Sequence, residues 1–387
     1  MTATKKEKVS FVAVLASIAI ITNPISAITI LGRGIFVYIY SLMLVAFLLK
    51  VSQRKKLFWN ATLTSFTVFL SYCLLGLFWS VDPDPTRLLQ ILVIIIVLGS
   101  YGFNNAEQNL IKIGAVISLL ITIYLVYVSS VGVQSDGRAT IYFLGIERDQ
   151  NYVSLLLLPG MAVLTKMIFE TPKTILKVLA TIIILLSLYT ELRLGSRGGI
   201  LSGLVLVGLS LLLYRKRSFS TIIIIIGVIL IIYSILPQIM ESLPEIVSNR
   251  LSRESVENDQ LSGRVWIWQR ITSMMFDDVN VFRLLFGYGT RSTILYIGMA
   301  AHNFILQYLF EGGFVCLVLL FMFIIRFIKS ARIAKDYLSL IIFLSSFFMA
   351  LSLSISGILE FWINIAVAFA LMNPNQYKTS TLELQKQ

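Results

Sequence analysis

Long apolar segments alternate with short polar connections along almost the whole chain. A helix needs about 17–25 mostly apolar residues to cross a bilayer, and about twelve segments of the sequence come close to this description. They lie near residues 9–31, 34–50, 59–80, 88–103, 110–131, 152–169, 174–191, 199–214, 219–236, 303–326, 337–355 and 358–373. The first is too long for the apolar core of a secretory signal, so we expect it to be a membrane helix. The pattern predicts an all-α integral membrane protein with about twelve transmembrane helices.

Composition supports this class and excludes a soluble protein. Hydrophobic residues make up 57% of the chain and charged residues only 13%, whereas soluble domains carry roughly 25% charged residues. Cys73 and Cys316 both lie within apolar segments, without the spacing of a metal site or a disulfide framework. We therefore interpret them as structural residues.

The polar connections fall into two sets that differ in their basic residues. The set that includes both termini contains every lysine of the chain. The opposite set contains arginines without lysine, namely Arg33, Arg87, Arg138, Arg148, Arg193, Arg197, Arg250, Arg253, Arg264, Arg270, Arg283 and Arg291. The positive-inside rule therefore predicts that both termini lie in the cytoplasm. The net charge of +12 reflects this topology and contact with anionic lipid rather than nucleic acid as a partner.

Two interpretations of the outer arginines are open at this point. A guanidinium group binds phosphate or carboxylate through two parallel hydrogen bonds, which an ammonium group cannot do. An outer face without lysine therefore favours recognition of an anion. Alternatively, topology removes lysine from that face and leaves arginine behind without any such role.

We expect residues 1–387 to form a single polytopic membrane domain, with a long extracytoplasmic loop at 237–302 between the ninth and tenth helices. Within this loop, LSGRVWIWQRITSMM has apolar residues at helical spacing, and Arg264 and Arg270 lie off the apolar stripe. This predicts an amphipathic helix at the outer membrane interface. A loop helix packed on the bundle fits the pattern equally well.

The single histidine of the chain, His302, lies at the outer start of the tenth segment, in GMAAHNFILQYLFEGG. Asn303, Gln307 and Glu311 follow at spacings of four residues, which places them on one face of the expected helix. Ionisable groups at membrane depth are costly and tend to be functional. Since a neutral imidazole with a pKa of about 6.5 accepts a proton from a hydroxyl group, we predict that His302 is a general base. The simpler interpretation is a polar side chain satisfied by local hydrogen bonds.

The hairpin ELRLGSRGG is a second candidate site. Arg193 and Arg197 lie at its outer end, and Gly195, Gly198 and Gly199 would leave backbone amides exposed. Such amides at a helix start, together with two guanidinium groups, would form a site for phosphate. Arginines that reach from a helix end to the membrane interface would show the same spacing.

Other polar residues of the outer face fit around such an anion. Arg264, in SGRVW, and Arg291, after GYGT, would complete an arginine cluster. Arg148, in ERDQNYVS, leads into the sixth helix and would bind sugar hydroxyls or position another arginine. The two aspartates of WSVDPDPTR fit a turn. Glu360 fits both an intramembrane acid and an ordinary helix-end residue.

Taken in order, the motifs WSVDP, ERDQN, LGSRGG, SGRVWIW, FGYGT and AHNFILQYLFEGG resemble those of the O-antigen polymerase and ligase family, of the Wzy and WaaL types. The resemblance covers most of the chain and rests on the ordered set, since no single motif is specific. It implies a metal-independent glycosyltransferase of the GT-C-like class that acts on undecaprenyl-pyrophosphate-linked sugars. By position, His302 matches the family's loop histidine, proposed to activate the acceptor hydroxyl. Arg197 and Arg264 match arginines thought to hold the donor pyrophosphate.

On this basis we expect a polysaccharide repeat-unit polymerase at the outer face of the bacterial cytoplasmic membrane. The expected catalytic residues are His302, Arg197 and Arg264, and the expected substrate-binding residues are Arg193, Arg291, Arg148, Asn303 and Glu311. Neither a metal nor another cofactor is expected. The expected partners are a lipid-linked oligosaccharide, the bilayer, and proteins of the flippase and chain-length-regulator type, but not nucleic acid.

Two alternatives are weighed against the polymerase. A ligase would move a finished glycan onto a different acceptor, and the motifs barely separate it from a polymerase. A transporter of lipid-linked sugars belongs to another class. Its site would lie near the midplane, usually within an internal repeat, whereas here the polar residues gather on one face.

Overall fold

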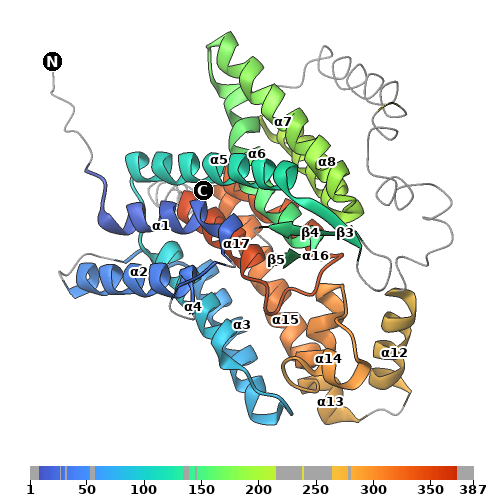
Figure 1. Cartoon of the computed structure of the whole chain (residues 1–387). Helices are drawn as coiled ribbons and strands as arrows, with labels where there is room; N and C mark the ends of the chain where they lie inside the picture. The colour runs from blue at the N-terminus through green and yellow to red at the C-terminus, as the bar shows by residue number, and fades with distance from the viewer. Residues whose placement is uncertain are drawn as a thin grey trace.

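The computed structural model describes residues 8–26, 28–30, 33–52, 57–133, 139–143, 146–214, 264–277 and 280–372, together with Gln238. These residues form a mostly helical bundle (Figure 1). Its helices, in chain order, are α1 (Phe11–Ile21), η1 (Asn23–Ile25), α2 (Ile35–Ser52), α3 (Ala61–Leu75), η2 (Gly76–Trp79), α4 (Pro85–Ser100), α5 (Asn105–Val128), α6 (Gln150–Glu170), α7 (Thr174–Leu194), α8 (Arg197–Tyr214), α12 (Arg264–Phe276), α13 (Val281–Phe286), α14 (Ser292–Ile297), α15 (Phe304–Ile333), α16 (Tyr337–Ala350) and α17 (Leu359–Leu371).

Seven helices in the described part of the chain are long and apolar enough to cross a membrane, which supports the predicted class of integral membrane protein. They are α2, α3 continued by η2, α5, α6, α7, α8 and α15. The shorter apolar helices α1, α4, α16 and α17 coincide with four further predicted segments. The remaining predicted segment, near 219–236, and residues 239–263 of the predicted loop lie outside the described residues. The number of membrane crossings therefore stays a prediction.

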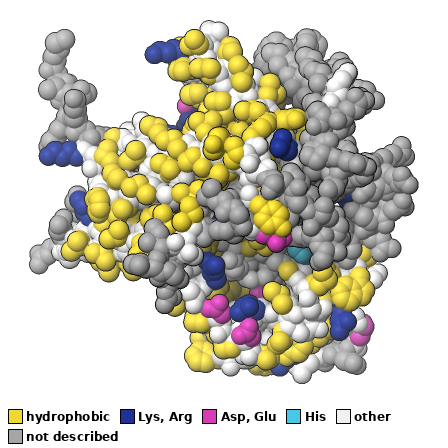
Figure 2. All heavy atoms as spheres, viewed as in Figure 1, with side chains coloured by type: hydrophobic (Ala, Val, Ile, Leu, Met, Phe, Trp, Pro, Cys, Tyr) yellow, Lys and Arg dark blue, Asp and Glu magenta, His cyan; other side chains and the backbone are white. Residues whose placement is uncertain are grey.

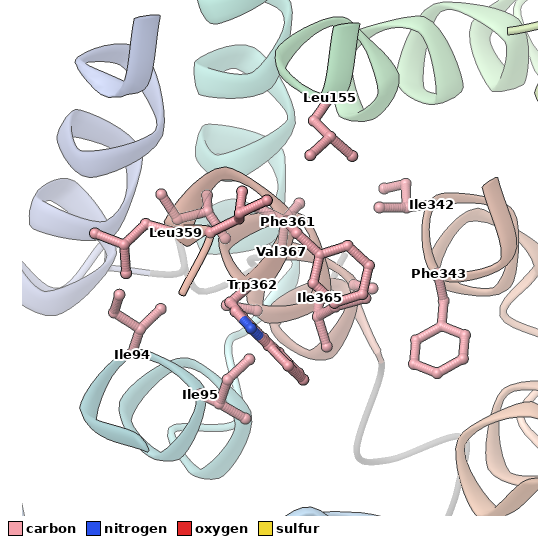
Figure 3. Packing of buried hydrophobic residues seen from close by; sticks show 14 of the residues in the cluster. Ile94, Ile95, Leu155, Ile342, Phe343, Leu359, Phe361, Trp362, Ile365 and Val367 are labelled. Atoms are coloured by element: carbon pink, nitrogen blue, oxygen red, sulfur yellow. The ribbon is translucent and has the colours of Figure 1, made fainter. Parts of the chain in front are cut away.

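The core of the bundle surrounds α17. Every residue of this helix from Leu359 to Leu371 is buried, as expected for a helix whose residues are apolar except Glu360 and Asn364. Figure 3 shows its side chains among those of Ile94 and Ile95 from α4, Leu155 from α6, and Ile342 and Phe343 from α16. Asn364 ties α17 to α6, because its Nδ2 donates to the Leu155 carbonyl oxygen at 2.8 Å. A polar bond of this kind fixes the relative position of two membrane helices.

Two small sheets lie in connections between helices. The first pairs β1 (Thr29–Ile30) with β2 (Arg33–Gly34), and the second has the antiparallel order β3 (Ser130–Val133), β4 (Ala139–Phe143), β5 (Ile146–Arg148). The mostly helical structure agrees with the all-α class, and the sequence did not indicate these two sheets because strands this short carry little periodicity. The second sheet affects the candidate site, since β5 ends at Arg148 directly before α6.

Helix α15 is broken in its first third, at Gly313, which has the left-handed backbone angle φ of 68°. A Cβ atom at Gly313 would lie 2.3 Å from the Leu285 carbonyl oxygen, so only glycine lets the two chains approach this closely. Next to the break, the carbonyl oxygens of Phe310 and Glu311 accept hydrogen bonds from the backbone N–H groups of Tyr288 (2.8 Å) and Gly289 (2.9 Å). The break thus docks the end of α13 and the following turn onto α15.

The docking predicts a large loss of stability for Gly313→Ala, because the substitution adds a backbone clash to an unfavourable φ. Gly298→Ala is the matched control: its φ is 83°, but no atom lies within 4 Å of a Cβ at that position. The control should lose only about 1–2 kcal/mol, the cost of left-handed backbone. Apparent melting temperatures in detergent measure both variants, and equal losses would show that the close approach is unimportant.

Candidate functional site

A cavity of about 610 Å³ opens at the end of the bundle where α4, α6, α15 and α17 begin. Its charged lining residues are Asp84, Arg87, Arg148, Arg291, Glu311 and Glu360. Figure 2 shows acidic and several basic side chains in the lower half of the face viewed, below a surface covered mainly by hydrophobic side chains. Among the described residues, no group of three or more His, Cys, Asp or Glu side chains is placed to hold a metal ion. We refer to this hollow as the outer cavity, because the predicted topology assigns this end of the bundle to the extracytoplasmic side.

Arg148 lies in the wall of the outer cavity, at the end of β5. Its guanidinium donates to Glu360 Oε1 at 3.3 Å and to Ser26 Oγ at 2.6 Å. The Arg148 and Glu360 side chains are only 18% and 11% exposed. Charges this sheltered require a partner, so the pair joins the small sheet to the first turn of α17.

Arg291 forms the second ionic contact of the cavity. Its guanidinium lies 3.1 Å from Asp82 Oδ2 and 3.9 Å from Asp84 Oδ2, both in the connection before α4. A hydrogen bond from the Thr86 backbone N–H, at 3.0 Å, holds the pKa of Asp84 below its usual value, and the charges of Arg291 and Arg87 act in the same direction. Asp82 and Asp84, which were predicted only as turn residues, therefore also hold the Arg291 side chain in place.

The predicted polar stripe on α15 is present and enters the outer cavity. Gln307 Nε2 donates to Glu311 Oε1 at 3.2 Å, and Thr293 Oγ1 donates to the same oxygen at 3.3 Å. Gln307 also contacts Ser356 Oγ at 2.5 Å. Asn303 does something different, because its Oδ1 accepts from the backbone N–H groups of Ile305 and Leu306 and so caps the start of α15.

His302 borders the cavity rather than lining it. Its backbone N–H donates to Ser354 Oγ at 2.8 Å, and Ala300 and Ser354 belong to the cavity wall. The residue adopts the left-handed φ of 48°. A non-glycine residue in this conformation is uncommon outside functional or turn positions. The backbone therefore holds His302 at the rim, directly before α15.

The hairpin of Arg193 and Arg197 differs in part from the prediction. The expected cradle of exposed amides is wrong at two positions, since Gly195 N–H donates to Leu192 O at 2.9 Å and Gly199 N–H donates to Ser196 Oγ at 3.0 Å. These bonds are the ordinary caps of α7 and α8. Two of the three predicted glycine amides are therefore not free to bind an anion.

The two arginines of the hairpin have different surroundings. The Arg193 guanidinium lies over the Tyr127 ring, 5.1 Å from its centroid, which is a cation–π contact. Arg197 is the first residue of α8 and is followed by Gly198, which approaches Ser352. A Cβ atom at Gly198 would clash with the Ser352 hydroxyl. The start of α8 is therefore packed against the segment that also holds Ser354.

Arg264 is the first residue of α12, and the predicted helix is confirmed. Its apolar side, with Ile267, Ile271 and Met275, is buried, and α12 contacts α13, α14 and α15. Trp268 Nε1 donates to the Ala301 carbonyl oxygen at 2.9 Å. These contacts favour the helix packed on the bundle over one that lies only on the membrane surface.

Sequence reasoning missed several residues of the site. Arg87, which was named among the outer arginines but not assigned to the site, lines the outer cavity and donates a hydrogen bond to Gln90 at 3.2 Å. Glu360 was left undecided, although an acid within an apolar segment is itself a signal of function. Glu191, in the same hairpin as the predicted arginines, is fully buried and accepts a hydrogen bond from Ser154 at 2.5 Å.

Residues 181–321 match the model of the O-antigen ligase family. The match runs from α7 to the middle of α15 and contains every predicted site residue except Arg148. No curated protein matches the chain. With the helical membrane architecture, this match confirms the resemblance to the O-antigen polymerase and ligase family, whose members are glycosyltransferase-like membrane enzymes of O-antigen polysaccharide synthesis.

The sheltered ion pair gives a quantitative prediction. Arg148→Leu and Glu360→Leu should each lower the free energy of unfolding by about 3 kcal/mol, because each leaves a partly buried charge without its partner. The double variant should lose less than the sum of the two. Asp82→Asn, at the exposed Arg291 pair, should lose less than about 1 kcal/mol. Unfolding in detergent measures all four, and additive losses would contradict the coupling.

Proposed function

We propose that this protein is a polysaccharide repeat-unit polymerase of the bacterial cytoplasmic membrane, with cytoplasmic termini and an extracytoplasmic active site. It transfers a growing glycan from undecaprenyl pyrophosphate to the non-reducing end of another lipid-linked repeat unit. The family match supports this proposal at the level of O-antigen polymerase- or ligase-type transfer. Hydrogen-bonding side chains in the wall of the outer cavity support a carbohydrate substrate, since sugars need many hydrogen-bonding partners.

The proposed reaction is a displacement at the anomeric carbon of the donor sugar. The acceptor hydroxyl oxygen forms the new glycosidic bond, and the His302 imidazole takes the hydroxyl proton. The bond between the anomeric carbon and the pyrophosphate oxygen breaks, and undecaprenyl pyrophosphate leaves with the bonding electrons. Arg197 and Arg264 stabilise the negative charge that grows on this leaving group. Such stabilisation accelerates the reaction because it is stronger in the transition state than in the bound substrate.

One observation carries this assignment: the three parts of the chain that bear the proposed catalytic residues are linked to one another through residues 301–302 and 352–354. Helix α12, which begins with Arg264, is bonded through Trp268 to Ala301, the residue before His302. His302 is itself bonded to Ser354, and the start of α8 packs on Ser352 in the same segment. Since Ala300 and Ser354 line the outer cavity, these links support a shared site beside it for parts of the chain that are far apart in the sequence.

The other predicted residues receive supporting roles. Arg148 and Arg291 are already paired with carboxylates, so we assign them to sugar hydroxyls and to the shape of the cavity rather than to pyrophosphate. Glu311 lines the cavity and is assigned to an acceptor hydroxyl. Arg193 supports the hairpin through Tyr127. Asn303 acts indirectly, because its cap fixes the start of α15 beside His302.

Ligase-type transfer onto a different acceptor is the second candidate. It is favoured by the description of the matching family model, O-antigen ligase. The same histidine and arginines would serve both reactions, because donor and leaving group are identical and only the acceptor differs. The fate of the lipid-linked glycan in cells therefore distinguishes the two.

Replacing the proposed base tests the mechanism. His302→Asn removes the imidazole and keeps a residue that tolerates positive φ, so the protein should reach the membrane in normal amount. Polymer should fall by at least about a hundredfold, the usual contribution of a general base. Met299→Asn, at an exposed side chain nearby, should keep full polymer length. Wild-type polymer in His302→Asn would exclude this residue as the base.

The arginine clamp has its own test. Arg197→Lys and Arg264→Lys keep the charge and lose the two-pronged hydrogen bonding, so each should reduce the transfer rate by roughly a hundredfold. Arg270→Lys, at an exposed position of the same helix as Arg264, is the matched control and should keep the wild-type rate. The assay is polymer formation in membranes supplied with lipid-linked repeat units. Full activity of Arg197→Lys would show that residue 197 needs only a positive charge at the helix end and does not bind pyrophosphate through two parallel hydrogen bonds.

A further inference from the structure

A second polar cavity, of about 420 Å³, lies at the other end of the bundle. Helices α6 and α17 connect the two cavities, since their first turns contribute Tyr152 and Glu360 to the outer cavity and their last turns contribute Glu170 and Leu371 to this one. The predicted topology assigns this end to the cytoplasm. Three lysines line the cavity, Lys112, Lys166 and Lys335, and we call it the lysine cavity.

Two hydrogen-bond donors at the lysine cavity lack a partner. Gln108 is only 6% exposed and lines the cavity, and within the described part of the chain its Nε2 has no hydrogen-bond partner. The buried Tyr214 hydroxyl, in the same lining, likewise has none among the described residues. A buried donor without a partner costs about 1–3 kcal/mol. A ligand with several acceptor oxygens would remove this cost.

The charges of the cavity favour an anion. The cavity wall contains two acidic residues beside the three lysines, Glu170 and Asp336. Glu170 Oε1 lies 3.6 Å from Lys166 Nζ. Asp336 caps α16 through bonds to Ser339, and its burial raises the pKa of its carboxyl, an effect that those bonds and the neighbouring Lys166 and Lys112 oppose. Both acids thus have partners within the protein.

The backbone of this region is explained by the end of α15. Lys335 follows the C-cap of this helix with the left-handed φ of 51°, and the N–H groups of Lys335 and Asp336 donate to the carbonyl oxygens of Arg332 (3.1 Å) and Ala331 (2.9 Å). This is an ordinary helix ending, so only the side chains that line the cavity indicate a ligand. Helix dipoles do not decide the matter, because α5 and α16 begin here while α6, α8 and α17 end here.

We propose that the lysine cavity is a binding site for a phosphate-class anion, either the headgroup of an anionic phospholipid or a free phosphate compound. Three ammonium groups, an amide N–H and a phenol O–H would surround the oxygens of one such group. Basic pockets between membrane helices bind phospholipid headgroups in this way. The site is separate from the proposed glycosyl transfer at the outer cavity, and its test does not depend on activity.

The test measures the apparent melting temperature of the full-length protein in nanodiscs. Protein in phosphatidylcholine discs is titrated with inorganic phosphate, and a second preparation contains phosphatidylglycerol. Lys112→Gln and Lys166→Gln remove cavity charges. Lys329→Gln is the matched control, because this exposed lysine of α15 is not part of the cavity wall. Gln108→Met removes the unpartnered donor.

If the ligand is a free anion, phosphate should stabilise the protein in phosphatidylcholine discs. Either cavity variant should then lower the affinity for phosphate about tenfold, and Lys329→Gln should not change it. Stabilisation by phosphatidylglycerol alone, with the same variant pattern, would establish a headgroup. Gln108→Met should raise the melting temperature without ligand and reduce the shift that ligand causes. The proposal is overturned by the absence of any shift, or by shifts that are equal in the cavity variants and the control.

Discussion

The break of α15 at Gly313 is the constraint on which the outer end of the structure depends. It lets the turn after α13 form backbone hydrogen bonds with α15, and Tyr72 adds a bond from its hydroxyl to the Gly312 carbonyl oxygen at 2.8 Å. The same turn continues into Arg291, whose ion pairs reach the connection before α4. One local conformation thereby fixes three separate parts of the chain around the cavity. An unbroken α15 would remove the partners of these backbone groups, and Gly287 and Gly289 of the turn are buried.

The helices that carry this arrangement also explain why polar groups gather at two ends of an apolar bundle. Between the two cavities, α17 is buried on all sides and packs through aliphatic and aromatic side chains (Figure 3). Polar side chains in this middle zone bond to neighbouring helices, as Asn364 does to Leu155. Ionisable side chains are tolerated where a charged partner or a solvent-filled cavity is near, so they gather at the ends of the helices.

Much of the fold could be predicted from sequence, because the length and the apolar composition of each segment predict a membrane helix without any information from the rest of the chain. The stripe from Asn303 to Glu311 and the helix that begins at Arg264 were predictable for the same reason, since periodicity is local information. The Arg148–Glu360 pair was not, because its members are 212 positions apart and only the packed bundle brings them together. The prediction that the amides of Gly195 and Gly199 are exposed failed for a related reason. A glycine in the sequence indicates a turn or a close approach of two chains, but it does not indicate which acceptor its N–H group bonds to.

The central claim, polymerisation at the outer face, is tested most directly by the lipid-linked glycans of a strain that lacks this gene. Mass spectrometry of the undecaprenyl-pyrophosphate pool, with labelling of sugars exposed at the outer face, reports both chain length and side of the membrane. The account predicts single repeat units that accumulate at the outer face. Long glycans still attached to undecaprenyl pyrophosphate would contradict it and establish a ligase, and single units trapped at the cytoplasmic face would establish a transporter.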